Sequence, residues 1–104
     1  MTVIGFLSVS PMREGSLSDE VAKAVAALDD YDVGYETTPM GTIIETDDVD
    51  ELLDAVGAAH TAVDGDRIST FLKIDDKRTV EHSASEKVDS VAESLGRRPA
   101  RSRD

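Results

Sequence analysis

A proline–glycine turn at the middle of the chain constrains the fold more than any other feature of the sequence. In Thr38-Pro39-Met40-Gly41 the proline occupies the second turn position and the glycine the fourth, as type I turns prefer. The segments on either side, 32–37 and 42–46, are short and rich in β-branched and aromatic residues, which is typical of strands. These features predict a β-hairpin that joins the two halves of one domain.

Hydrophobic periodicity and capping signals predict the other elements. Alternating apolar residues indicate strands over 2–10 and 67–75, before and after the hairpin. Apolar residues at helical spacing indicate three helices, each with an N-terminal signal. The predicted helices run from Ser16, with Asp19 in a capping box, to about residue 30; over 49–63, capped by Asp47 or Asp48; and from Ser83, with Glu86 in a capping box, to Leu95 and a stop at Gly96.

This order, β-α-β-β-α-β-α, contains a ferredoxin-like βαββαβ core. Right-handed crossovers place the first two helices on one face of a four-stranded antiparallel sheet. We therefore expect an α+β ferredoxin-like sandwich over residues 1–96, with an additional C-terminal helix, and a basic disordered tail over 97–104. Strand alternation assigns to the uncovered sheet face Phe6, Ser8, Ile43, Glu45, Phe71 and Lys73. Such an apolar face predicts a homo-oligomer, a dimer or tetramer that covers it or pairs an edge strand.

The charge of the chain is strongly acidic. The net charge is −11, and residues 1–96 alone carry 7 bases and 21 acids, because four arginines lie in the tail. This surface disfavours nucleic-acid binding. Together with many Asp, few Lys and small apolar residues, it predicts a halophilic protein whose self-repulsion is screened by salt; an ordinary acidic protein is the alternative. No apolar run in the sequence approaches the roughly 20 residues of a membrane span, and no leader-like segment precedes the first strand, so we expect a cytoplasmic protein without a membrane span.

Few residues are suited to catalysis. The chain has no Cys, and its two histidines, His60 and His82, lack metal-ligand spacing. Asp75 and Asp76 are neighbours on a strand and point to opposite faces, so they do not form an acid pair. No glycine-rich phosphate loop is present. We expect no catalytic residues, no metal and no cofactor, and therefore a protein that is not an enzyme.

Ligand binding is better supported. Ser8, Glu45 and Lys73 are predicted to lie in one row of the uncovered face, beside three apolar side chains. An apolar wall with a few polar groups is typical of small-molecule sites. The alternative is a Glu45–Lys73 ion pair inside an oligomer interface.

The central motif, Thr38-Pro39-Met40-Gly41-Thr42-Ile43-Ile44-Glu45, resembles the signature of a family of small thiamine-binding proteins, relatives of YkoF-like proteins and long known as a conserved family of unknown function. The match spans about residues 2–95 and includes three further segments: Ser8–Pro11 with Gly15, Lys73–Arg78 and Lys87–Val91. The acidic surface and the arginine-rich tail depart from the family, which bears on environment rather than activity.

The resemblance implies a ferredoxin-like oligomer that binds thiamine or its hydroxymethylpyrimidine part without catalysis, for buffering, delivery or sensing of the vitamin. The candidate ligand contacts on these motifs are Ser8, Ser10, Thr38, Met40, Thr42, Glu45, Phe71 and Lys73. Two alternatives stay open: a small ferredoxin-like enzyme, and an assembly module without a ligand.

Overall fold

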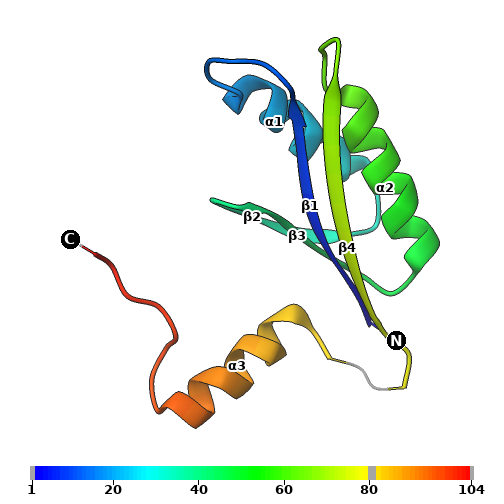
Figure 1. Ribbon diagram of the computed structural model, residues 1–104. Coiled ribbons are helices and arrows are strands. Elements are labelled where there is room, and N and C mark those ends of the chain that lie inside the picture. Colours follow the sequence, from blue (N-terminus) through cyan, green and yellow to red (C-terminus); the bar gives the residue numbers. More distant parts are fainter. Residues whose placement is uncertain (1, 80–81, 104) are drawn as a thin grey trace.

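The computed structural model describes residues 2–79 and 82–103 and has the predicted ferredoxin-like architecture (Figure 1). A four-stranded antiparallel sheet has the order β2-β3-β1-β4. Helices α1 and α2 cover one face, and α3 lies apart from them (Figure 1). The elements are β1 (Thr2–Pro11), α1 (Ser18–Ala27) with a 3₁₀ turn (Leu28–Asp30), β2 (Gly34–Thr38), β3 (Gly41–Thr46), α2 (Val49–Ala62), β4 (Ile68–Lys77) and α3 (Ala84–Leu95).

Two of the three predicted helix starts are confirmed. The Asp48 carboxylate accepts a hydrogen bond from the Asp50 N–H at the start of α2, and the Ser83 hydroxyl accepts from the Glu86 N–H at the start of α3. The predicted cap of α1 at Ser16 is wrong by one residue. Leu17, in a non-helical conformation, occupies the cap position without a side-chain cap. None of the α-helices in the described ranges has both the length and the hydropathy to cross a membrane.

The core lies between the sheet and the two covering helices. It consists of alternate residues of β1, Ile44 of β3 and the inner faces of α1 and α2. Leu52 of α2 is fully buried, and a β-carbon built on Gly5 would lie 2.9 Å from its side chain. Glycine at position 5 therefore lets α2 approach the middle of β1 closely. The buried apolar residues are Val3, Leu7, Val9, Ala24, Leu28, Ile44, Leu52, Ala55, Val56, Ala59 and Val63.

The opposite sheet face, called here the open face, carries the residues that strand alternation assigned to it. Phe6 and Phe71 form an edge-to-face pair with ring centroids 6.3 Å apart. The strand register, however, corrects the prediction that Ser8, Glu45 and Lys73 form one row. They lie in three successive rows. The first row pairs Ser8 with Phe71, the second joins Ile43, Phe6 and Lys73, and the third joins Glu45, Ile4 and Asp75. Alternation fixes the face, whereas the row depends on the pairing register.

The first turn of α3 contacts the open face at its Glu45–Asp75 row. The Glu45 carboxylate accepts a hydrogen bond of 3.2 Å from the Ala84 N–H, and Lys87 forms an ion pair with Asp75. Among the described residues of one chain no ion pair joins Glu45 to Lys73, and the alternative of such a pair inside an oligomer interface stays a prediction. α3 has no buried residue, although both of its ends are well capped.

Candidate ligand-binding cavity

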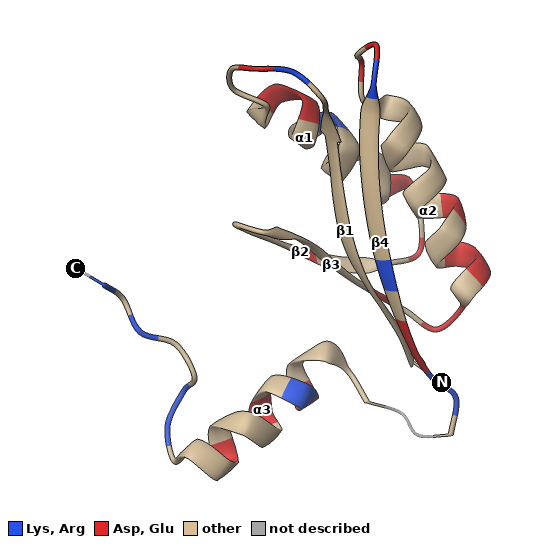
Figure 2. Cartoon of the chain, in the orientation of Figure 1, with Lys and Arg blue, Asp and Glu red and all other residues tan. Residues whose placement is uncertain are grey.

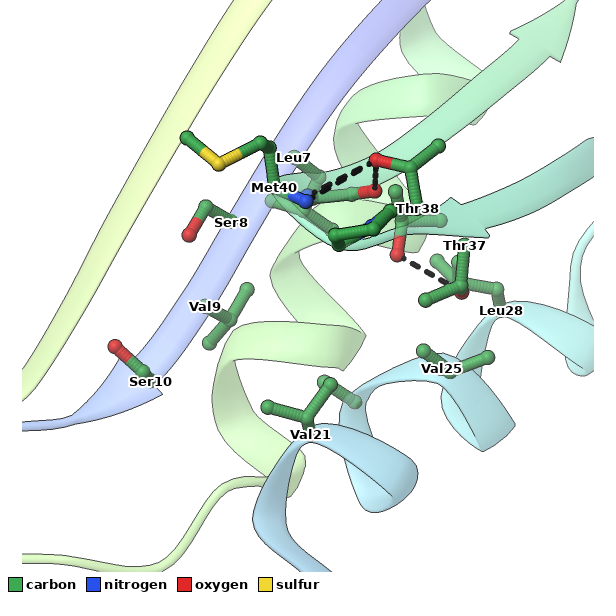
Figure 3. A pocket seen from close by; sticks show the side chains of 14 residues that line it. Leu7, Ser8, Val9, Ser10, Val21, Val25, Leu28, Thr37, Thr38 and Met40 are labelled. Carbon is green, nitrogen blue, oxygen red and sulfur yellow. Dashed lines mark hydrogen bonds between the residues drawn. The ribbon is translucent and has the colours of Figure 1, made fainter. Parts of the chain in front are cut away.

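A cavity of about 160 Å³ lies between α1, the end of β1 and the β2–β3 turn (Figure 3). Three separate segments of the chain meet there, and each contributes a different chemistry: β1 supplies serines, α1 supplies apolar side chains, and the hairpin supplies threonines and a methionine. The lining residues are Leu7, Ser8, Val9, Ser10, Val21, Ala24, Val25, Leu28, Thr37, Thr38, Pro39, Met40, Gly41 and Thr42.

The cavity exists because β1 is longer than the strand beside it. β3 starts at Gly41 and pairs with β1 only as far as Leu7, whereas β1 continues to Pro11 beside β4. Successive residues of a strand direct their peptide groups to alternate edges. One of Val9 and Ser10 therefore directs its N–H and C=O toward the edge that β3 leaves free. This edge supplies a backbone donor and acceptor beside the cavity.

The wall that α1 contributes to the cavity is apolar. Val21 and Val25 of α1 face β1 and the hairpin (Figure 3), and both remain partly exposed although they belong to the apolar stripe of the helix. Met40, at the tip of the turn, is 80% exposed and extends over the opposite side. A flat ring in the cavity would thus meet aliphatic groups and a thioether, which packs favourably on aromatic rings.

The hydroxyl groups of the cavity divide into two sets. Those of the hairpin are already paired: Thr37 and Thr42 share a hydrogen bond of 3.1 Å, and the Thr38 hydroxyl donates to the Gly41 carbonyl at 2.8 Å. Within the described residues, the hydroxyls of Ser8 and Ser10 make no hydrogen bond. Both serines are partly exposed. They are thus the side chains with hydrogen-bonding capacity left for a ligand.

Position 41 requires glycine because the hairpin approaches β1 closely there. A β-carbon at this position would lie 2.8 Å from the Leu7 carbonyl oxygen and 2.7 Å from the Phe6 ring. The backbone of Gly41 is not in the left-handed region, so the restriction is steric rather than conformational. The glycine that the sequence placed in a turn therefore also keeps the hairpin, which forms one side of the cavity, tight against β1.

Five of the eight predicted contacts line this one cavity, and three do not. The five are Ser8, Ser10, Thr38, Met40 and Thr42. The other three are elsewhere on the open face, where Glu45 holds the start of α3, Phe71 packs on Phe6, and Lys73 pairs in register with Phe6.

Sequence reasoning missed the contribution of α1. Val21 and Val25 belong to the apolar residues at helical spacing that predict the first helix, and Thr37 ends the first strand segment of the predicted hairpin. No signal in the sequence separates these two valines from core residues, because both roles require an apolar side chain at the same helical spacing.

The cavity is electrically neutral, since none of its lining residues is charged. The shifted pKa values belong to ion pairs outside it. The hydrogen bond from Lys23, with a second from the Asp64 N–H, lowers the pKa of Glu20. The hydrogen bond from Lys87 likewise lowers the pKa of Asp75. Binding in the cavity itself must therefore rest on shape, apolar contact and neutral hydrogen bonds.

Comparisons with known proteins place the chain in a family. The family model described as thiamine-binding protein matches residues 6–92. A UPF0045 protein of Methanothermobacter thermautotrophicus is 49% identical over 83 residues, which cover 77% of this chain and 84% of that protein. A UPF0045 protein of Methanocaldococcus jannaschii is 37% identical over 94 residues, 88% of this chain and 93% of that one.

Solved structures show the same fold. The crystal structure of the M. jannaschii protein has a TM-score of 0.81, with 88% of this chain and 97% of that chain covered. The structure of a Thermotoga maritima protein provisionally assigned to thiamine biosynthesis or salvage has 24% identity and a TM-score of 0.71. The match covers 88% of this chain and 99% of that chain. That likeness extends to the fold alone. The family model and the two archaeal relatives together show that this chain belongs to the family of thiamine-binding proteins.

Proposed function

We propose that the protein binds thiamine through its hydroxymethylpyrimidine ring, in the cavity beside β1, and leaves the ligand chemically unchanged. The observation that carries this proposal is the match between the cavity's size and a single ring. Its volume is about 160 Å³, and a protein cavity of about 150 Å³ holds one benzene molecule. The two-ring vitamin therefore fits only with its second ring outside.

The polar groups of the cavity suit an aminopyrimidine. Its ring nitrogens accept hydrogen bonds and its amino group donates them. The Ser8 and Ser10 hydroxyls can do either, and the free edge of β1 offers a backbone donor and acceptor together. Val21 and Val25 would contact one side of the ring and Met40 the other (Figure 3).

The cationic thiazolium ring would remain outside, at the surface of a body that carries 7 bases and 21 acids over residues 1–96. Such a surface raises the local concentration of cations at low salt and does so weakly at high salt. The eight predicted contacts thus reduce, in this proposal, to the five that line the cavity. Glu45, Phe71 and Lys73 have no part in it.

Isothermal titration tests the proposal directly. We expect thiamine and free hydroxymethylpyrimidine to bind one site per chain, with similar contacts. Replacing Ser8 or Ser10 by Ala should lower the affinity for both ligands about 2- to 10-fold, the usual value of one neutral hydrogen bond. Ser94→Ala, on an exposed turn of α3, is the matched control and should bind as the wild type does. Absence of binding by both ligands would contradict the proposal, and turnover of a bound ligand would favour the enzyme alternative.

Assembly into a dimer or tetramer is the second part of the proposal. Its support is the open face, on which Phe71 is 58% exposed although it lies in a sheet. A binding protein of this kind would buffer, deliver or sense the vitamin. If no ligand binds and the oligomer is stable, the assembly-module alternative gains support instead.

A further inference from the structure

We infer that α3 is an interface helix, whose apolar stripe packs on the open sheet face of a second copy of this chain. The inference rests on the proposed assembly into oligomers and names its contact surfaces. The stripe consists of Val88, Val91 and Leu95, which are 54%, 55% and 47% exposed. The receiving surface consists of Phe6, Ile43 and Phe71 on the open face.

The helix is specified by the sequence but has too little to pack against in its own chain. Ser83 caps its start and Gly96, in the left-handed conformation, ends it. Isolated helices shorter than about 12–15 residues are marginal in water, so a helix of 12 residues needs tertiary packing. Because no α3 residue is buried, that packing has to come from outside the chain.

The open face lacks the layer that α1 and α2 give to the opposite face. A sheet with two apolar faces requires a cover on both, and a helix with an apolar stripe is the usual cover. The start of α3 reaches only the Glu45–Asp75 row of its own sheet. Phe71 lies four residues further along β4, about 13 Å at 3.3 Å per residue. Between the start of α3 and the sheet there remains a groove of about 500 Å³, lined partly by Ile4, Ile43 and Val88.

Charge complementarity favours a second copy as the occupant. Residues 84–103, which comprise α3 and the described tail, carry five bases and three acids, whereas residues 1–83 carry six bases and eighteen acids. The positive charge of this segment lies in its tail, where residues 97–103 carry four arginines and no acid, whereas α3 itself carries one base and three acids (Figure 2). Docking of α3 on another copy brings the arginine tail that follows it toward an acidic body, and this attraction steers association.

A matched pair of substitutions tests the assignment. Leu95 on α3 and Leu53 on α2 are both leucines on helices, and both are 47% exposed. By light scattering at fixed protomer concentration, Leu95→Glu should raise the dissociation constant of the oligomer at least tenfold. Leu53→Glu should leave it unchanged. Phe71→Glu, on the receiving surface, should act as Leu95→Glu does. Dissociation by Leu53→Glu alone would overturn the inference, because the helix layer would then be the interface.

Cross-linking identifies the two surfaces as partners. The chain has no natural Cys, so Val91→Cys and Phe71→Cys each introduce a single thiol. The two variants are purified separately, mixed and oxidised mildly. We expect a disulfide-linked species of twice the 11.2 kDa chain mass, in higher yield from the mixture than from either variant alone.

The outcomes separate this inference from the proposed function. An oligomer that neither Leu95→Glu nor Phe71→Glu weakens would overturn the interface and leave the proposed assembly standing. A wild-type monomer in light scattering would overturn both. Titration with thiamine gives a readout that is independent of either result.

Discussion

Gly41→Ala is the most direct test of how the hairpin forms the cavity. The added β-carbon would lie 2.8 Å from the Leu7 carbonyl oxygen, whereas ordinary contacts begin at 3.4 Å. The Phe6 ring, 2.7 Å from the same position, can move, but a carbonyl in a central strand moves only with the sheet. The hairpin must therefore shift by about half an ångström. Overpacking of this kind costs about 1–3 kcal/mol.

Thermal unfolding at fixed protomer concentration measures this cost. A domain of this size loses about 4–8 °C of melting temperature per kcal/mol, so a cost of about 1–3 kcal/mol predicts a fall of about 4–24 °C. Titration of the same variant with thiamine should show weaker binding, since one side of the cavity has moved. Gly57→Ala is the control: nothing lies within 4 Å of its added carbon in α2, and the higher helix propensity of Ala should raise the melting temperature. A Gly41→Ala protein that melts at or above the wild-type temperature would refute the steric argument.

Four further predictions follow from charge and composition. The melting temperature should rise between 0.1 and 2 M KCl, as salt screens the repulsion within the acidic body; a flat response would remove the support for a halophilic protein. Because the pKa of Glu20 is lowered, its contribution to stability is present above the ordinary value of 4.5 and is lost as pH falls through the lowered value. Glu20→Gln should therefore flatten the acid limb of the stability–pH curve, and an unchanged limb would contradict the role of its pairing with Lys23. Thiamine diphosphate should bind no more tightly than thiamine in competition titrations, because no cationic side chain lines the cavity; tighter binding would place the phosphates on a cationic surface elsewhere. Truncation after Gly96 should leave folding intact by circular dichroism, since the helix is complete there; loss of structure would contradict the proposed domain boundary.

The fold could be predicted from the sequence because its determinants are local. The Thr38–Gly41 turn fixes the hairpin register, and the capping residues Asp48 and Ser83 fix two helix starts. Each of these signals involves residues within a few positions of one another. Chain order and crossover handedness then leave few ways to arrange four strands.

The pairing of distant strands could not be predicted in the same way. Alternation assigned Ser8, Glu45 and Lys73 to the correct face, but each strand can slide in steps of two residues without changing that face. The register that places Ile4 opposite Glu45 is set by packing between β1 and the helices, including the close approach of Leu52 to Gly5. The prediction of one row failed for this reason.

The cavity depends on a difference between two strand lengths, which no single motif contains. β1 continues past Leu7, the last residue that β3 pairs with, and only this mismatch frees a strand edge beside Val21 and Val25. The central motif nevertheless contributes Thr38, Met40 and Thr42, because the same turn that ends β2 and starts β3 also decides where β1 loses its neighbour. The turn thus acts on the site through strand length as well as through its own side chains. Lengthening β3 by two paired residues should therefore close the cavity without altering any of the side chains from β1 or α1.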